Sequence, residues 1–568
     1  MIFAHGSALQ PSTSRRLSDL GNRREVVDSV IGKDFPEPLL AAVAELAGDE
    51  LKTALATLRR AEFIHEQALY PVAEYAFKHP LTQEVALGSQ LRERRRQGHA
   101  AVARAIEQQD AERLDERAAL LAHHWEEAGE ALSAARWHRR AAEWVARTDF
   151  AAATHHWGRV RALLRELPDD HEAAALGITA CTQLLSMSRR FGMGLDEARA
   201  LLEEGQALAN AIGDRRAHLY LSMVYSNALN GAGDMAAYLE LALENQRAAL
   251  EIDDLAVQAN ASRYLIVALG FAARLPEALQ LAEDGLARFP RHLPPSEWLT
   301  GLNPYSAFLS WRGYCLTWAA RLPEGLEELA RSRRLAEEDG TPELAGYALY
   351  FAAEAYYSAH DADRAVASAR QLEEVSRRLG EPPIMVARTQ LAFGYAHLAG
   401  GRAADAIAPA RAALDLHGRV DKLNAGMSAT LLAEALLAAG DLSATEAATE
   451  AIALCRRSLR GNYEAAAYGV LARTLLRRDG AAARDAAAAA LASAAALIER
   501  TGARTLAPAL CEWRAELAAV LGDEVTRAQL LRQAEQGYDD IGAPGHAERL
   551  RARATTPPKP LTDLILSS

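Results

Sequence analysis

Helix-forming residues and apolar positions at helical spacing run through almost the whole chain. Ala, Leu, Glu and Arg recur from one end to the other, and runs of β-branched residues are scarce. Such a composition favours helix over strand. From about residue 200 onward, helical stretches alternate with short turns containing Gly or Pro, as at 274–277, 321–324, 399–402 and 439–442. The pattern predicts helix pairs joined by tight turns.

A small residue recurs in the first turn of the second helix of each predicted pair. The intervals are 47, 40, 41, 41, 39 and 42 residues, and the residues are Ala278, Gly325, Ala365, Ala406, Ala447, Ala486 and Ala528. Ala198 lies two further periods upstream. A period of about 40 residues is typical of a solenoid of stacked helix pairs. The first interval is long because the proline-rich segment 289–295 cannot be helical and is expected to form an inserted loop.

Small residues also pair at a separation of 12 positions, as at Gly313/Gly325, Ala353/Ala365, Gly394/Ala406 and Ala435/Ala447. Two antiparallel helices approach closely only where each carries a small side chain. The tetratricopeptide repeat has this separation, and 391–396 (LAFGYA) resembles its first helix. HEAT-like repeats fit the period but not the 12-residue pair. We therefore predict an all-α fold, a right-handed superhelical, tetratricopeptide-like solenoid over 108–554.

Residues 25–107 follow a different pattern. Val26–Ile31 and Glu37–Leu46 are expected to be helical, and Glu50–Arg60 forms an amphipathic pattern. Two short alternating segments, 63–66 and 75–78, then flank a turn and predict a β-hairpin.

Three helices followed by a hairpin outline a small winged-helix-like domain over 25–107. Residues 1–24 are expected to be unstructured or unrelated to it. The tail 555–568 contains three prolines and is expected to be disordered.

Composition and charge narrow the function classes. The 568 residues are 50% hydrophobic and 24% charged, with a net charge of −12. We therefore expect a large folded core, and the acidic balance argues against a nucleic-acid partner. The longest run without a charged residue, 217–233, is shorter than the roughly 20 residues that a membrane span needs. The four cysteines form no CxxC pair. We expect a cytoplasmic protein without a zinc site or disulfides.

Three segments carry a resemblance to a known family: 29–46 (SVIGKDFPEPLLAAVAEL), 58–107 with its AEYAFKHPLTQEVALGSQLRERRR block, and 116–144 with its AHHWEEAGEAL block. They resemble the region that follows the ATPase core in large bacterial signalling ATPases. The closest resemblance is to proteins with an N-terminal class III adenylate cyclase domain, a central signal-transduction ATPase and a C-terminal tetratricopeptide array. It covers about residues 26 to 550.

The catalytic parts of that family are missing from the sequence. No GxxxxGK[ST] motif occurs, since Gly32-Lys33 is followed by Asp34, and such a motif is what would hold phosphates and Mg²⁺. No cyclase domain precedes the winged helix either. We therefore expect no enzymatic activity, no active site and no cofactor.

His79 lies at the end of the second hairpin segment, in Phe77-Lys78-His79-Pro80. The resemblance implies a nucleotide-sensing role for this histidine, provided that another chain supplies the P-loop. The alternative is a histidine that caps the helix expected to begin near residue 81.

The motif HHW occurs twice, at 123–125 and 155–157. Adjacent histidines on a helix point about 100° apart and cannot chelate a metal as an i,i+4 pair would. Packing related to the repeat is the favoured interpretation, and no metal site is predicted. The arginines of 92–96 could contact phosphates, but the run contains Glu93 and lies outside the expected recognition helix.

An aromatic stripe marks the middle of the repeat region. Its members Tyr305, Phe308, Trp311, Tyr314 and Trp318 fall at spacings of 3, 3, 3 and 4 and share one helix face. Such a stripe is most often core, but an aromatic concave surface would also suit a protein partner or a small effector.

Three functions remain open at this point. The first is a non-catalytic scaffold or sensor that binds a protein or effector on its concave surface. The second is the regulatory half of a split adenylate cyclase or ATPase that works with a nucleotide-binding chain in trans. The third is a DNA-binding regulator, which the acidic composition disfavours.

Overall fold

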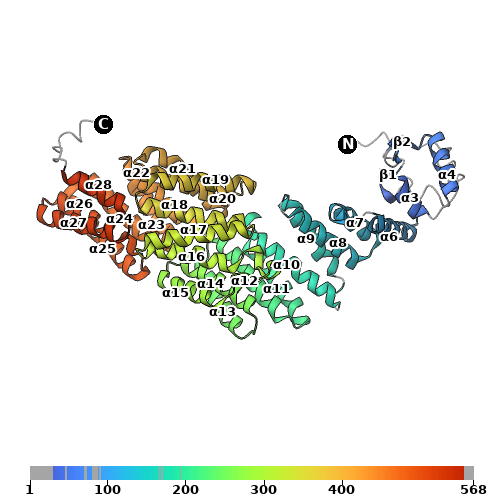
Figure 1. Cartoon of the computed structure of the whole chain (residues 1–568), viewed down its shortest axis with the longest axis horizontal. Helices are drawn as coiled ribbons and strands as arrows, with labels where there is room; N and C mark the ends of the chain where they lie inside the picture. The colour runs from blue at the N-terminus through green and yellow to red at the C-terminus, as the bar shows by residue number, and fades with distance from the viewer. Residues whose placement is uncertain are drawn as a thin grey trace, which may run out of the picture. The chain divides into compact units, whose positions relative to one another are not determined.

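The computed structural model describes residues 30–44, 48–68, 73–79, 83, 87, 91–109, 111–146, 148–165, 167, 170–191 and 193–555. The chain divides into two compact units, Met1–Leu184 and Leu185–Ser568, and the division falls within helix α10. Figure 1 follows the elements along the chain from blue to red. Each unit is described by itself.

Unit 1 begins with a small three-stranded sheet among helices. Its elements are β1 (Asp34–Pro36), α3 (Glu37–Ala44), α4 (Gly48–Arg60), β2 (Ile64–Ala68), β3 (Glu74–Phe77), α6 (Arg92–Gln109), α7 (Leu114–Ala128), α8 (Ala131–Val145), α9 (Phe150–Leu164) and α10 (His171–Phe191). The strand order is β1-β3-β2, antiparallel throughout, with Ile64 opposite Phe77 and a register shift after Glu66. The predicted hairpin and the amphipathic helix over 50–60 are therefore confirmed.

The apolar side chains of the sheet and of α6 and α7 form one core. Phe35, Leu40 and Leu55 are at most 3% exposed and pack in the same cluster as Val102 and Leu121. The strands of unit 1 are thus joined to the first repeat helices by burial of a common apolar surface.

Unit 2 consists of helices that alternate regularly along the chain. They are α11 (Leu195–Ala211), α12 (Arg215–Ala232), α13 (Met235–Leu250), α14 (Leu255–Phe271), α15 (Leu275–Arg288), α16 (Pro304–Trp318), α17 (Leu322–Glu338), α18 (Pro342–Ser358), α19 (Ala362–Arg378), α20 (Pro383–Ala399), α21 (Ala403–Val420), α22 (Ala425–Ala438), α23 (Ala444–Arg457), α24 (Gly461–Asp479), α25 (Arg484–Thr501), α26 (Ala507–Val520), α27 (Glu524–Asp540) and α28 (Pro544–Thr555). Five 3₁₀ turns accompany them: η1 (Pro295–Glu297), η2 (Leu299–Gly301), η3 (Lys422–Asn424), η4 (Gly480–Ala483) and η5 (Arg504–Leu506).

Local sequence fixes many of these helix ends. Asp214, Asp234 and Asp254 precede α12, α13 and α14, and each side chain accepts a backbone N–H from the first turn. This is the N-cap role that aspartate favours. Pro276 and Pro323 stand in the first turn of α15 and α17, where a missing N–H costs no helical hydrogen bond.

The even-numbered helices from α12 to α26 contact one another in chain order and form an inner layer. The odd-numbered helices pack on that layer as an outer one, with charged residues on their exposed faces. α14 shows the consequence of the inner position, since nearly all of its residues are buried. The chain is an all-α, tetratricopeptide-like solenoid with small N-terminal strands.

The paired small residues mark the close approach of the two helices in a repeat. A Cβ added to Gly325 would lie 2.8 Å from the carbonyl oxygen of Gly313, and one added to Gly313 would lie 2.9 Å from that of Gly325. Ala198, Ala278, Ala365 and Ala406 are fully buried, as the repeat predicted.

The small-residue prediction is wrong in the last three units. Ala486 and Ala528 are exposed, and Ala447 is half-buried. The buried alanines are the next ones along the chain, Ala448 and Ala487. In an alanine-rich stretch several neighbouring positions satisfy the same pattern, so spacing alone did not set the register.

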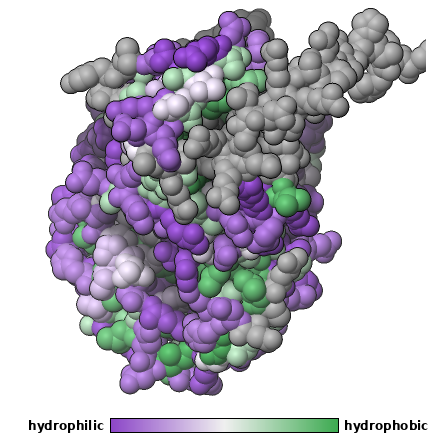
Figure 2. Space-filling view, turned by 90° about the vertical axis from the view of Figure 1, so that its right-hand side faces the viewer, coloured by the Kyte–Doolittle hydropathy of each residue, from purple (hydrophilic) through white to green (hydrophobic). Residues whose placement is uncertain are grey.

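One stretch, Gly461–Thr501, contains an 18-residue window of mean hydropathy 1.4, apolar enough by length and composition to cross a membrane. It is not one continuous helix, because Gly480 adopts φ 59° between α24 and α25 and the two helices pack against each other. The stretch contributes buried residues such as Ala487, Leu491 and Leu497 to one core cluster of unit 2, and 39% of the window is buried. Figure 2 shows a face of the molecule on which hydrophilic side chains predominate and apolar ones form separate small groups.

Candidate functional site

The predicted aromatic stripe lies on α16 but does not have a single environment. Four of its members are at most 8% exposed: Phe308, Trp311, Tyr314 and Trp318. Tyr305, at the start of the helix, is half-buried. The Trp311 ring fills the space beside Gly270, where an added Cβ would lie 2.3 Å from it. Most of the stripe is therefore packed, and only its first residue is partly open to solvent.

The last repeats cover the stripe from the inside of the solenoid. Asn462 donates a hydrogen bond to the Tyr314 hydroxyl, 148 residues earlier in the chain, at 3.1 Å. The Tyr463 ring meets the Trp318 ring at a centroid distance of 5.2 Å. The inner faces of α16 and α24 thus pack directly on each other.

Turns of early repeats also contact residues of late repeats. The Thr505 hydroxyl accepts the backbone N–H of Ala320 at 2.9 Å, across 185 residues, and donates to the Thr317 carbonyl oxygen. The His360 and His546 rings lie 4.7 Å apart at a similar sequence separation. Unit 2 therefore winds back on itself, and its inner surface is closed over α16 and α18.

A buried carboxylate lies in this closed interior. Glu354 of α18 is 6% exposed, and its Oε1 accepts hydrogen bonds from the Tyr463 hydroxyl at 2.7 Å and the Tyr395 hydroxyl at 3.2 Å. Burial raises the pKa of Glu354 to about 7, although the two hydroxyl donors and Arg460 favour the charged form.

Little free space remains among these side chains. A cavity of about 10 Å³, room for about one water molecule, lies between Arg388, Arg460 and the surrounding rings of Phe271, Tyr314, Tyr347, Tyr350, Phe351 and Tyr463. This cavity has no room for a ligand larger than about one water molecule.

Tyr305 faces a more open cleft. The cleft has a volume of about 280 Å³ and is lined by Tyr305 with Arg291, Leu309, Arg331, Arg334, Leu335 and Glu338. Arg291 and Glu338 form an ion pair across it at 2.8 Å. Among the stripe residues, Tyr305 is the one placed where a partner could reach it.

The inserted loop predicted from the long repeat interval is present between α15 and α16. Phe289 leaves helical geometry with φ −94° and ψ 143°, and the loop passes through η1 and η2 before Asn303 caps α16. It is seated on α12 and α14 of the inner layer by three side chains.

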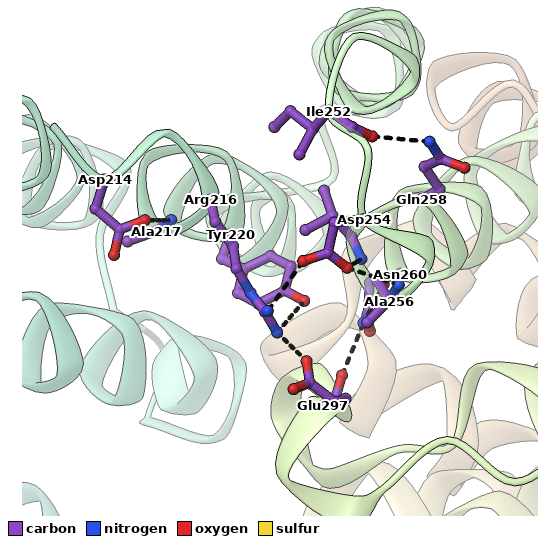
Figure 3. Close-up of polar contacts among 11 residues, drawn as sticks. Asp214, Arg216, Ala217, Tyr220, Ile252, Asp254, Ala256, Gln258, Asn260 and Glu297 are labelled. Atoms are coloured by element: carbon purple, nitrogen blue, oxygen red, sulfur yellow. Dashed lines mark hydrogen bonds and ion pairs between the residues drawn. The ribbon is translucent and has the colours of Figure 1, made fainter.

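Arg216 of α12 is the first of these, and Figure 3 shows its guanidinium between two carboxylates. Its Nη1 donates to Asp254 at 3.0 Å, and its Nη2 donates to the Tyr220 hydroxyl and to the Glu297 carboxylate of the loop. Asp254 and Tyr220 hold the arginine in place, so that Glu297 takes a donor already aimed at it.

Asn260 and Arg263 of α14 hold the main chain of the loop. Asn260 Nδ2 donates to the Glu297 carbonyl oxygen at 3.0 Å, and its Oδ1 accepts the Leu299 N–H at 3.2 Å. Arg263 Nη2 donates to the Leu299 carbonyl oxygen at 3.2 Å. Both side chains are at most 5% exposed.

Sequence reasoning missed these residues, although α14 carried a signal. Gln258, Asn260, Ser262 and Arg263 fall within six positions of an otherwise apolar helix, and all are buried. Buried polar side chains need partners. Four of them in one inner helix indicated that something polar, here a loop main chain, packs against it.

In unit 1, His79 is exposed at the end of β3. The helix that His79 was expected to cap would begin near residue 81, which lies outside the described residues. Both expected roles of His79 therefore stay predictions. Within the arginine run, Arg96 donates to the carbonyl oxygen of Ala128 at 2.9 Å and thereby caps the C-terminal end of α7.

The duplicated HHW motif forms two equivalent histidine pairs. His99 of α6 and His124 of α7 meet with their Nδ1 atoms 3.0 Å apart, and His138 of α8 and His156 of α9 meet at 2.9 Å. In each pair the second histidine of the motif contacts a histidine of the preceding helix. The interpretation of the motif as repeat-related packing fits this geometry.

These pairs are held in the neutral state. Burial, with help from neighbouring charge, lowers the pKa of His99 to about 4 and that of His124 to about 3. Burial also lowers the pKa of His138, although its Nε2 lies 3.0 Å from the Glu126 carboxylate. A short Nδ1–Nδ1 contact requires that one ring donates and the other accepts, which two protonated rings cannot do.

An open groove of about 420 Å³ runs beside the second pair, lined by Ala119, His123, Glu126, Glu127, His138, His155, His156 and Arg159. Within the residues that the structure describes, no group of three or more His, Cys, Asp or Glu side chains is arranged to hold a metal ion. All four cysteines are among those residues, and none forms a disulfide.

Comparisons with known proteins found similarity among solved structures. No protein-family model and no curated protein matches it. Among solved structures, it is similar to a Rap protein in complex with competence and sporulation factor, at 13% identity and a TM-score of 0.48, over 66% of this chain and 99% of that one. It is also similar to the APC/C hetero-tetramer Cut9–Hcn1, at 11% identity and a TM-score of 0.48, over 86% and 91%.

A third similar structure is a signal-transduction ATPase with a tetratricopeptide repeat sensor from Pyrococcus horikoshii. The identity is 12% and the TM-score 0.28, over 97% of this chain and 67% of that one. Likeness at these identities is one of helical-repeat architecture, and no statement about what this chain binds rests on it.

Proposed function

We propose that the chain is a non-catalytic, cytoplasmic helical-repeat scaffold or sensor of signal transduction that binds a protein partner through the open ends of the inner-layer helices of unit 2, outside the closed interior. The observation that carries this proposal is the continuous inner layer from α12 to α26. Solenoids of this kind gather side chains from many repeats on one surface, which suits an extended protein partner better than a small substrate.

The arrangement of side chains supports a binding role over a catalytic one. The buried carboxylate of Glu354 accepts hydrogen bonds from two tyrosine hydroxyls, and the cavity among the neighbouring rings is about 10 Å³, too small for a substrate. The open cleft at the start of α16 is lined by tyrosine and arginine, as at Tyr305, Arg291 and Arg331. These residue types are enriched where proteins bind one another.

A second candidate function is that of the regulatory half of a split signalling ATPase. The sequence resemblance over 26–550 and the sheet of unit 1 support it. The order β1-α3-α4-β2-β3 with strand order β1-β3-β2 is that expected of a winged-helix domain over 25–107, followed by repeats over 108–554. His79 is exposed at the end of β3, where it could face a nucleotide held by another chain.

Partner capture with a matched pair of tyrosine variants tests the main proposal. Tyr305→Ala removes the half-buried member of the stripe, and Tyr356→Ala removes a half-buried tyrosine that contacts Arg364 elsewhere on the array. Tagged chains are isolated from the native host, and co-purifying proteins are identified by mass spectrometry. We expect Tyr305→Ala to lose a partner that Tyr356→Ala keeps, with both variants melting like the parent. Equal capture by all three chains would contradict the proposed surface.

A further inference from the structure

Side chains of α12 and α14 bind the inserted loop through its main chain and one acidic side chain, as a protein binds an extended peptide. Asn260 uses both ends of its amide on the main chain of residues 297 and 299, and Arg263 takes the next carbonyl oxygen. Contacts to the main chain do not depend on the side chains of the bound segment. The same three bonds would therefore hold any segment that follows the same path.

Two contacts with side chains of the loop add selectivity to these main-chain hydrogen bonds. Arg216, held by Asp254 and Tyr220, receives the carboxylate of Glu297. Leu299, two residues later, is buried with 7% exposure. The site thus selects a non-helical segment in which an acidic residue is followed, two positions later, by an apolar residue.

The loop leaves one part of the site unused. Arg263 is 5% exposed, and its Nε has no hydrogen-bond partner, although its Nη2 is bonded to the Leu299 carbonyl oxygen. Nε and Nη2 share one edge of a guanidinium, and that edge matches the two oxygens of a carboxylate. Here the single carbonyl oxygen of Leu299 accepts from Nη2 and leaves Nε without a partner.

We propose that this site binds the free C-terminus of a partner protein, with an acidic residue two positions before an apolar last residue. The terminal carboxylate would take both Nε and Nη2 of Arg263, Asn260 would hold the preceding main chain, and Arg216 would take the acidic side chain. The inserted loop occupies the site as an internal substitute that such a C-terminus displaces. The inference rests on the proposed function and names its partner class.

Two synthetic peptides test the central feature. Both copy residues 292–299 (HLPPSEWL) and carry an N-terminal fluorophore; one ends in a free carboxylate and the other in an amide. Binding is measured by fluorescence anisotropy to the full chain carrying Glu297→Ala and Leu299→Ala, which weakens the loop but leaves Arg216, Asn260 and Arg263 intact. We expect the carboxylate peptide to bind about tenfold more tightly than the amide, since it adds a charge-assisted bond.

Two further variants in that background locate the effect. Arg263→Gln is expected to abolish the difference between the peptides. Arg288→Gln, which removes a neighbouring arginine bonded to Gln258, is expected to preserve it. Thermal melting verifies that each chain is folded, and if Arg263→Gln does not fold, the comparison of the two peptides on the loop-weakened chain decides alone.

The proposal is overturned if the two peptides bind the folded, loop-weakened chain equally or not at all. It is also overturned if the preference for the carboxylate survives Arg263→Gln or is lost equally in Arg288→Gln. Capture of a partner that depends on Tyr305 would then still support the scaffold function, so failure of this inference and failure of the proposed function give different results.

Discussion

The two units bury titratable groups whose partners lie at very different separations along the chain. In unit 1, the His99–His124 and His138–His156 pairs each join two consecutive helices. In unit 2, Glu354 joins α18 to Tyr463, 109 residues away. The histidines are bases kept neutral by burial, and Glu354 is an acid whose neutral form burial favours.

This difference separates two ways of stabilising a solenoid. The pairs of unit 1 belong to neighbouring helices, so each can open locally without disturbing distant repeats. The interior of unit 2 closes only when repeats 185 or more residues apart meet, as at Ala320, Thr317 and Thr505. A disturbance there is expected to spread through several repeats.

The largest expected effect is that of Trp311→Ala. Trp311 is 4% exposed and contacts the rings of Phe271, Tyr314 and Phe351, so the substitution should destabilise unit 2 by about 3–5 kcal/mol. Trp144→Ala in unit 1 is the matched control, since Trp144 is 53% exposed and should cost little. Urea unfolding followed by circular dichroism measures both. Similar losses of stability in the two variants would show that the Trp311 side chain is not packed in a core.

Acidification should weaken unit 1 next. The pKa values of His99 and His124 are depressed in the folded state to about 4 and 3. Their stabilising contribution is therefore complete above the unfolded pKa of about 6.5 and is lost as pH falls below it. We expect a loss on the order of 2–4 kcal/mol for the pair between pH 7 and pH 5.

Hydrogen exchange of α6 and α7, corrected for its intrinsic pH dependence, measures that loss. His124→Gln serves as the control, because glutamine takes up no proton in this pH range. The stability of this variant should therefore depend less on pH. Identical pH profiles for the parent and this variant would count against the neutral pair.

Glu354→Gln should act in the opposite pH direction and with a smaller effect. The folded pKa of Glu354 is raised to about 7, so its stabilising contribution is complete below about pH 4.5 and is lost as pH rises through 7. Glutamine keeps an acceptor for Tyr463 and Tyr395 but cannot ionise. The variant should be more stable than the parent by on the order of 2 kcal/mol at pH 8 and similar at pH 5. Thermal melting at both pH values checks this, and a variant less stable than the parent at pH 8 would contradict it.

The sequence predicted the elements of the fold but not its closure. Spacing located the helix pairs, the glycine contact between Gly313 and Gly325, and the inserted loop, because these depend on residues close in the chain. The contact between Thr505 and Ala320 has no periodic signal and depends on the accumulated winding of several repeats. Consequently the stripe could not be assigned to core or to surface until the late repeats were placed.

The polar site on α14 was out of reach for a related reason. Asn260 and Arg263 are unremarkable types in a helix, and their significance comes from the loop seated on them. Proline content predicted that the loop exists but not which helices it covers. A search for buried polar residues on inner helices would have pointed to the region without naming its ligand.

Hydrogen–deuterium exchange of the loop tests most directly whether the inner face of unit 2 is occupied by the chain's own segment. The amide of Leu299 donates to Asn260 Oδ1, so fragments that cover residues 296–303 should be protected in the parent chain and should exchange much faster in Asn260→Ala. If those fragments exchange in the parent as rapidly as an exposed loop, the loop does not occupy α12 and α14, and the site proposed there is not held from within.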